Sequence, residues 1–179
     1  MDCRDSLLRT LASVPTNRYV LVLGCTDGTY TAPLLRLGFP VHACSNSEAA
    51  VQATRTAIAD LMADPADTAE CVQTCTPELN DYPDSAFDWV VAPHLDALYV
   101  HASADLAFDA VQRVLKPGGW ALIGLTPANA DADAKSAWPV TSDTLVERCA
   151  QHHLISSKAP RTDTSEAPAH LYELFQRER

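Results

Sequence analysis

The stretch VLVLGCTDGTYT, Val20–Thr31, decides the fold. An apolar run rich in β-branched residues ends at Gly24, a short polar turn carries a second glycine at Gly28, and a helical pattern follows. A strand that is apolar on both faces is typical of the centre of a parallel sheet. Glycines in the turn that follows allow the backbone to approach a ligand closely. The stretch therefore predicts a central parallel strand that ends in a nucleotide- or cofactor-binding loop.

Helix and strand patterns alternate on both sides of this stretch. We expect strands over 19–24, 40–45, 70–75, 87–92 and 120–125, with loops over 63–70 and 76–86 and a turn over 116–119. We expect helices over 3–13, from near Thr29–Thr31 to about Leu37, after Ser47, after Ser103, and over 142–152. The stretch 127–140 is typical of a mobile segment, and the chain ends in a pattern of two strands around a polar hairpin loop.

Proline and glycine set the limits of the helix that follows the first strand. Pro33 lacks an N–H, so it is tolerated in the first turn of a helix and costs a hydrogen bond further in. A helix that begins near Thr29–Thr31 satisfies this condition, and Gly38 is a typical C-terminal cap. Ser47 and Ser103 are preferred N-cap residues for the helices after them.

The order of the predicted elements indicates one α/β domain over residues 1–179. Strands separated by helices form a parallel sheet with right-handed crossovers. The two strands in succession at the end of the chain add an antiparallel edge. Residues 1–17 are expected to form an N-terminal helix and linker outside the repeating pattern.

Composition excludes several classes of protein. The chain is 47% hydrophobic and carries a net charge of −10, with no basic cluster that would attract nucleic acid. Its apolar runs are too short to span a bilayer, and its first residues lack the apolar core of a secretion signal. We therefore expect a cytoplasmic, acidic protein with no nucleic-acid or membrane partner.

The six cysteines do not form a recognisable metal or disulfide framework. Cys71 and Cys75 are four residues apart in the predicted third strand, but no CxxC pair or histidine at metal-ligand spacing accompanies them. A chain of this length does not need disulfides to fold. We expect buried free thiols and no metal site.

Four stretches of the chain resemble class I S-adenosylmethionine (SAM)-dependent methyltransferases of the small-molecule type. They are VLVLGCTDGTY (20–30), HACSNSEAAVQATR (42–55), YPDSAFDWVVA (82–92) and, above all, AFDAVQRVLKPGGWALIGL (107–125). The resemblance implies a Rossmann-like, doubly wound seven-stranded sheet in the order 3-2-1-4-5-7-6, with strand seven antiparallel. It also implies transfer of a methyl group from SAM to a small-molecule acceptor.

The resemblance implies a cofactor site in the loops after the first four strands, at the switch point of the sheet. Gly24 and Gly28 match the outer glycines of the family's loop. Asp27 either accepts a hydrogen bond from the amino group of SAM or caps the next helix. The cofactor-binding residues implied are Gly24, Cys25, Thr26, Asp27, Gly28, Ser45, Asn46, Thr76, Pro77 and Pro93.

Three acidic positions of the family pattern carry neutral residues in this chain. Val22 stands for the acid of the first strand, Ser45 for the acid that binds the ribose hydroxyls, and Thr76 for the acid near the adenine. A shift of one residue in the alignment would bring Asn46 rather than Ser45 to the ribose. Thr26 also replaces the middle glycine of the loop.

These replacements predict a weaker grip on the cofactor. A hydrogen bond to a charged group contributes roughly 1.5–3 kcal/mol, and a neutral one roughly 0.5–1.5 kcal/mol. Loss of the ribose carboxylate alone then weakens binding about tenfold to a hundredfold.

An alternative hypothesis is a non-catalytic binding or regulatory module whose cofactor site has decayed. A nicotinamide-dependent dehydrogenase fits poorly, because both the glycine spacing and the expected acid are missing.

The segment after the fourth strand is the candidate acceptor site. Its polar side chains are His94, Asp96, Tyr99 and His101. His94 is the residue best suited to act as a base if the acceptor must lose a proton, and a solvated strand-end histidine is the alternative. His152 and His153 lie at a predicted helix C-terminus, where a cation is favoured, and we interpret them as structural.

Overall fold

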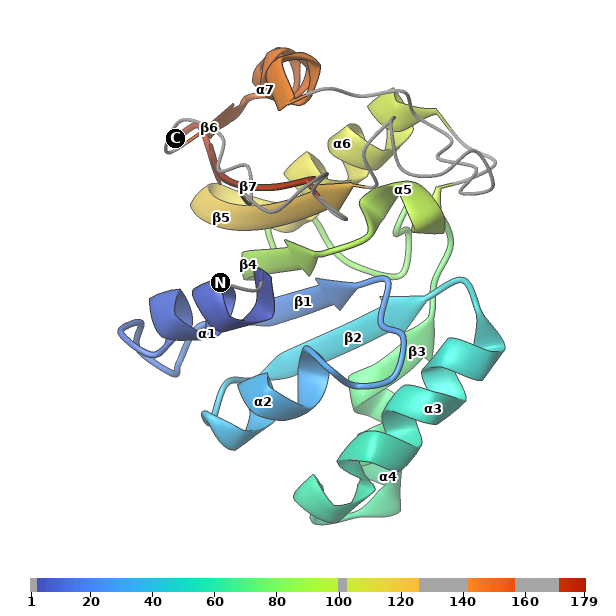
Figure 1. The fold of residues 1–179 in the computed structure, drawn as a ribbon. Coiled ribbons are helices and arrows are strands. Elements are labelled where there is room, and N and C mark those ends of the chain that lie inside the picture. The colour runs from blue at the N-terminus through green and yellow to red at the C-terminus, as the bar shows by residue number, and fades with distance from the viewer. Residues whose placement is uncertain (1–2, 100–102, 126–141, 157–170) are drawn as a thin grey trace, which may run out of the picture.

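Seven strands form one mixed sheet in the order β3-β2-β1-β4-β5-β7-β6, with helices on both faces (Figure 1). This arrangement comes from a computed structural model, which describes residues 3–99, 103–125, 142–156 and 171–179. β7 is antiparallel to both of its neighbours, and the remaining pairs are parallel. The predicted fold class and strand order are therefore confirmed.

The bounds of the elements follow the predicted alternation closely. The strands are β1 (Val20–Leu23), β2 (Val41–Ser45), β3 (Val72–Thr74), β4 (Phe87–Ala92), β5 (Leu115–Leu125), β6 (Leu154–Ser156) and β7 (Leu171–Arg177). The helices are α1 (Cys3–Leu11), α2 (Thr31–Arg36), α3 (Glu48–Ile58), α4 (Pro65–Cys71), α5 (Leu95–Leu98), α6 (Ala104–Val114) and α7 (Ser142–Gln151), with a 3₁₀ turn at Ala59–Leu61. The expected mobile segment 127–140 and the hairpin loop before β7 lie outside the described residues.

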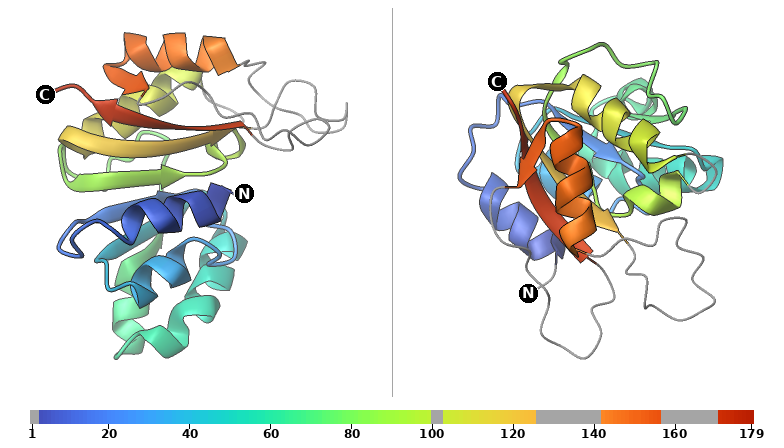
Figure 2. Two further views of the ribbon diagram at one scale, coloured as in Figure 1. Left: turned by 60° about the vertical axis from the view of Figure 1, so that its left-hand side comes forward. Right: turned by 90° about the horizontal axis from the view of Figure 1, so that it is seen from above.

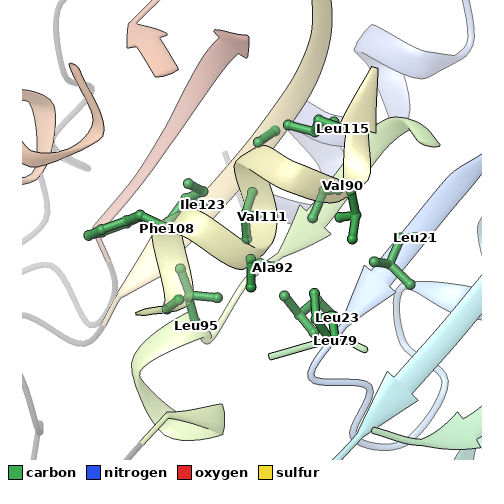
Figure 3. Close-up of a cluster of buried hydrophobic side chains, with 14 of the residues drawn as sticks. Leu21, Leu23, Leu79, Val90, Ala92, Leu95, Phe108, Val111, Leu115 and Ile123 are labelled. Carbon is green, nitrogen blue, oxygen red and sulfur yellow. The ribbon is translucent and has the colours of Figure 1, made fainter. Parts of the chain in front are cut away.

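β1 is buried on both faces and separates two apolar cores. Leu21 and Leu23 belong to a core that includes residues of α5, α6 and α7, part of which Figure 3 shows. Val20 and Val22 belong to a second core with residues of α1, α2 and α3. Figure 2 shows α1 and α6 on opposite sides of the sheet. The two-sided apolar pattern of the sequence thus predicted a central strand correctly.

The predicted caps and the first-turn proline are confirmed. α2 begins at Thr31, which places Pro33 in its first turn, and Gly38 follows its end with φ +86°. The Ser47 hydroxyl accepts a hydrogen bond from the Ala50 N–H, and the Ser103 hydroxyl accepts one from the Leu106 N–H. Each serine therefore satisfies a donor that the helix itself leaves without a partner.

The predicted loop over 63–70 is wrong, because most of it is helix α4. Asp64 is its N-cap and accepts a hydrogen bond from the Ala66 N–H, while Pro65 occupies the first turn. These are strong helix-start signals. Cys71 ends this helix, so Cys71 and Cys75 do not share one strand as we predicted.

The predicted turn over 116–119 is part of β5 and forms a bulge in the sheet. Leu115 pairs with Phe87 and Trp120 pairs with Trp89, so four residues of β5 lie opposite the single residue Asp88. Gly118 has φ +77°, which allows the chain to bend away and return.

The expected free thiols are confirmed for the cysteines whose side chains the structure describes. Cys25, Cys44, Cys71, Cys75 and Cys149 are all buried and unbridged. Within the described ranges, no helix has the length and apolar character needed to cross a membrane.

Asp88, at the amino end of β4, forms hydrogen bonds to the linker after α1 and to the bulge of β5. Its side chain is 11% exposed, and it accepts hydrogen bonds from Lys116 Nζ at 2.8 Å, the Tyr19 N–H at 3.0 Å and Arg18 Nη1 at 3.1 Å. Burial alone would raise the pKa of Asp88, but these three donors outweigh it and lower the pKa below its usual value. The carboxylate therefore joins the linker after α1 to the bulge of β5.

We expect Asp88→Asn to lower the free energy of unfolding at pH 7 by about 1–3 kcal/mol, because two cations lose their carboxylate. The lowered pKa means that the wild-type advantage is complete above about pH 4 and shrinks as pH falls through that pKa. Urea denaturation at pH 7 and in more acidic buffers measures both effects. Asp84→Asn is the control, because that carboxylate is 76% exposed. An equal loss in the control, or a difference independent of pH, would contradict this account.

Candidate functional site

The segments after β1, β2 and β3 are joined by main-chain hydrogen bonds at the carboxyl edge of the sheet. The N–H groups of Gly24 and Cys25 both donate to the carbonyl of Cys44, at 2.8 and 3.0 Å. The Cys75 N–H donates to the carbonyl of Ser45 at 3.0 Å. The ends of the three strands are therefore held in fixed positions relative to one another.

The segment after β4 reaches the same edge, contacts the segments after β2 and β3, and lies near Gly24. Asn46 Nδ2 donates to the Leu98 carbonyl at 2.9 Å, and the Tyr99 hydroxyl donates to the Pro77 carbonyl at 2.6 Å. A Cβ placed on Gly24 would lie 3.9 Å from the carbonyl oxygen of His94. α5 lies at the edge toward which the arrowheads of β1, β2 and β4 point (Figure 1). The four loops thus converge at one edge.

The two glycines of the first loop are required for different reasons. Gly24 has φ +80° and its Cβ would make only an ordinary contact, so its backbone conformation is what selects glycine. Gly28 has φ +84°, and its Cβ would lie 2.7 Å from the Cβ of Ala57 in α3. We predicted that glycine at both positions lets the backbone approach a ligand closely. At Gly28 a side chain would also clash with α3.

Asp27 stabilises the loop rather than the helix after it. Its Oδ1 accepts hydrogen bonds from the Thr29 hydroxyl at 2.5 Å, the Thr29 N–H at 3.0 Å and the Thr26 hydroxyl at 3.1 Å. The bonds from Thr29 are the main reason that the pKa of Asp27 is lowered. The N-cap of α2 is Tyr30, which makes no side-chain capping bond. The helix-cap interpretation of Asp27 is therefore wrong, and its exposed carboxylate remains ionised beside the glycine turn.

The side chain of Cys25 is buried beneath the loop and does not face the site. Its side chain is 3% exposed and belongs to the core beneath α2 and α3, and this burial raises the pKa of the thiol. Its N–H already donates to Cys44. Cys25 therefore shapes the loop through its backbone, and its thiol is not available to a ligand.

Ser45 and Asn46 at the end of β2 differ in exposure. Ser45 is 5% exposed, and its hydroxyl accepts a hydrogen bond from the Ser47 N–H at 3.2 Å. Asn46 is exposed, and its amide nitrogen is held by the Leu98 carbonyl. Because an amide has a second polar atom, this contact leaves Asn46 Oδ1 as an oriented acceptor.

The loop after β3 presents Thr76 and the backbone of Pro77. Thr76 is exposed, and its carbonyl accepts a hydrogen bond from the Leu79 N–H at 3.0 Å. Leu79 is fully buried and adopts φ +55°, an unfavourable conformation for leucine. Its side chain lies beside that of Leu23 in the core (Figure 3). Burial of Leu79 therefore anchors the loop that carries Thr76 and Pro77.

The segment after β4 carries a partly exposed histidine and a buried acid. His94 is partly exposed and precedes α5, whereas Asp96 in that helix is 3% exposed. Pro93 is buried with its backbone against Gly124, where a Cβ would lie 2.2 Å from the Pro93 carbonyl oxygen. The sequence patterns did not predict α5, because a helix of four residues is too short to show periodicity. His101 lies outside the described residues.

The histidines after α7 contact carboxylates of α6 and of the end of the chain. His152 Nδ1 lies 2.7 Å from Asp109 Oδ1, and its Nε2 lies 3.4 Å from Asp105 Oδ1. His153 Nδ1 lies 2.7 Å from Glu178 Oε2. These contacts join α7 to α6 and to the end of the chain, as a structural role requires.

The opposite, amino edge of the sheet has an open hollow of about 390 Å³. Tyr19, His42, Tyr82 and Lys116 are among its lining residues. The loop after β3 reaches this hollow with its far part, around Tyr82, whereas Thr76 and Pro77 lie at the carboxyl edge.

The sequence of this chain matches the methyltransferase domain family. Its profile matches residues 21–123, which run from β1 to β5 and include all four loops of the candidate site. No curated protein sequence matches the chain.

Solved structures share the fold at low sequence identity. The YcgJ protein from Bacillus subtilis is 12% identical with a TM-score of 0.73, and the match covers 98% of each chain. A TehB-like SAM-dependent methyltransferase from Corynebacterium glutamicum is 17% identical with a TM-score of 0.69, over 99% of this chain and 89% of that one. The 1,6-didemethyltoxoflavin-N1-methyltransferase from Burkholderia thailandensis, solved with 1,6-didemethyltoxoflavin and S-adenosylhomocysteine bound, is 18% identical with a TM-score of 0.70, over 98% and 77%.

We expect Gly28→Ala to lower the free energy of unfolding by about 2–4 kcal/mol, from an unfavourable φ and a clash with Ala57. Ala57→Gly removes the clash but not the backbone strain, and by itself costs about 1 kcal/mol of helix propensity. The double variant should therefore lose less than the sum of the two single losses. Chemical denaturation of the four proteins measures this coupling. Simple additivity would show that α3 does not select glycine at this position.

Proposed function

The chain belongs to the methyltransferase domain family, and from that premise we propose that it transfers a methyl group from SAM to a small-molecule acceptor. One observation carries the assignment of the site: four strand-end loops, including the glycine loop, are tied together at the carboxyl edge of the sheet. Ligands of doubly wound sheets bind at this edge. SAM, when bound, supplies a methyl group activated by a sulfonium centre.

The residues at this edge fit such a cofactor. Gly24 has no side chain, and a Cβ there would lie 3.9 Å from the His94 carbonyl oxygen, so the backbone of both loops is available where they meet. The ionised carboxylate of Asp27 suits the amino group of the methionine part. Thr76 and Pro77 offer a polar group and an apolar ring edge to the adenine. The hydroxyl of Thr26 is already engaged by Asp27, so we assign Thr26 to shaping the loop.

Asn46, rather than Ser45, is the residue that we assign to the ribose hydroxyls. Asn46 is exposed with Oδ1 oriented as an acceptor, whereas Ser45 is buried and its oxygen already accepts a bond. An amide oxygen accepts one neutral hydrogen bond where the family pattern has a bidentate carboxylate. Neutral contacts are about 1 kcal/mol weaker each, so we expect a lower affinity for SAM than a carboxylate would give.

The acceptor side of the site contains His94. Methyl transfer depends above all on alignment of the acceptor atom with the methyl group. A hydroxyl or acidic N–H acceptor must also lose its proton, and His94 at the edge of the site is suited to accept it. We propose His94 as this base, and a small-molecule acceptor of that type as the substrate.

The cellular setting that we propose is the cytoplasm. Five buried cysteines are free thiols, as in proteins of reducing compartments. The acidic composition supports a small molecule rather than nucleic acid as the partner.

Calorimetric titration with SAM and with S-adenosylhomocysteine tests the proposed cofactor. We expect saturable binding of both, with a dissociation constant in the micromolar range or weaker, because the ribose contact is neutral. A flat titration at millimolar ligand would support the non-catalytic module instead.

We expect Asn46→Asp to tighten SAM binding about fivefold, because a carboxylate accepts from the ribose hydroxyls more strongly than an amide. The gain is limited by the loss of the Nδ2 contact with the Leu98 carbonyl. Ser45→Asp is the matched variant, and we expect it to lower stability without tightening binding, since it buries a carboxylate. Tighter binding by Ser45→Asp with no change in Asn46→Asp would reverse the assignment.

A further inference from the structure

α5 and the residue that follows it connect the loops on the two sides of the site. Leu95 is fully buried and packs in the core with Phe108 and Ile123 (Figure 3). Pro93, just before it, lies against Gly124 of β5 so closely that any side chain at Gly124 would clash. The start of this segment is therefore fixed to the sheet, and its far end is a rigid support for other groups.

Two adjacent residues at the end of this segment, Leu98 and Tyr99, form hydrogen bonds to the loops after β2 and β3. The Leu98 carbonyl accepts the amide of Asn46, and the Tyr99 hydroxyl donates to the Pro77 carbonyl at 2.6 Å. Tyr99 is 1% exposed, so its hydroxyl exchanges no bond with bulk water when it binds Pro77. Burial raises the pKa of Tyr99, which keeps the phenol protonated and able to donate.

The loop that Tyr99 holds has independent anchors on its other side. Leu79 inserts into the core, and Arg113 Nη2 of α6 donates to the carbonyls of Glu78 and Leu79 at 3.1 and 2.9 Å. These contacts fix the loop from residue 78 onward. The bond from Tyr99 reaches the residue just before, next to Thr76. It therefore controls the short stretch that faces the site.

We propose that Tyr99 is a positioning residue for the nucleoside part of the cofactor, which fixes the spacing between Asn46 and Thr76–Pro77 from the acceptor side of the site. This inference rests on the proposed function. Tyr99 touches neither reacting atom in this role. It acts through Pro77, while the adjacent Leu98 carbonyl acts through Asn46.

The test is Tyr99→Phe, which removes the hydroxyl and keeps the buried ring. Calorimetry with S-adenosylhomocysteine and with methylthioadenosine, which lacks the amino-acid part, separates the two ends of the ligand. We expect both dissociation constants to rise by the same factor, about three- to tenfold, because both ligands carry the nucleoside. Tyr82→Phe is the control: it removes a buried phenol that lies at the far end of the same loop, and binding should stay within twofold of wild type.

A ligand-free measurement gives a second test. Amide hydrogen exchange in residues 76–79 should be faster in Tyr99→Phe than in wild type, while exchange in β1 and β4 is unchanged. A purely structural role would lower the melting temperature and leave affinity unchanged in conditions where both proteins are folded.

The outcomes separate this inference from the function on which it rests. If wild type binds both ligands and Tyr99→Phe binds them equally well, Tyr99 has no positioning role. If Tyr99→Phe weakens S-adenosylhomocysteine more than methylthioadenosine, the damage extends beyond the nucleoside and the inference is wrong. If wild type binds neither ligand, the proposed function fails and this inference fails with it.

Discussion

The carbonyl of Cys44 accepts two N–H groups, those of Gly24 and Cys25, and the carboxyl edge of the molecule is organised around this contact. It holds the first turn after β1 against the end of β2, which is possible only because Gly24 adopts φ +80°. A side chain at that position would require a strained backbone, and the loop would leave the edge. The contact therefore fixes the glycine loop against the end of β2.

The two ends of β4 have separate roles. At its amino end Asp88 is a buried carboxylate with three donors, and it contributes stability. At its carboxyl end the chain passes over Gly124 into α5 and supplies His94 and Tyr99 to the opposite edge. The acids that the family pattern places at Val22, Ser45 and Thr76 are absent here. On the proposed function the cofactor is held by backbone groups, by the amide of Asn46, by the carboxylate of Asp27 and by the shape of the loops. Such a site depends more on the positions of its loops than a site built on ion pairs does.

The sheet order was implied by the family resemblance, whereas the caps could be predicted from local signals. The helix ends are set by residues that act on their immediate neighbours, namely Pro33, Gly38, Ser47 and Ser103. The apolar run of β1 has a position at the centre of a parallel sheet as its usual explanation. Contacts between residues distant in sequence could not be predicted in this way. The role of Gly28 depends on Ala57, which is distant in sequence and adjacent only after α3 has packed.

The remaining differences between prediction and structure lie at α4, at residues 116–119 and in the burial of side chains in the site. Asp64 followed by Pro65 is a proper helix start, and it outweighs the polar composition that suggested a loop. The Lys-Pro-Gly-Gly turn is a real bend, but both of its sides pair with β4, so the strand continues through it. The sequence does not show which side chains of the site are buried: Cys25 belongs to the core and Ser45 is buried, and only the packed structure shows this.

A crystal structure of the protein with S-adenosylhomocysteine tests the central claim most directly, because the claim concerns where the cofactor lies and what holds it. Our account predicts the ligand across the carboxyl ends of β1, β2 and β3, with the ribose hydroxyls within hydrogen-bond distance of Asn46 Oδ1 and the adenine against Thr76 and Pro77. A ligand in the hollow at the amino edge, beside Tyr19 and Lys116, would contradict it. So would a ribose bound through Ser45 with Asn46 turned away.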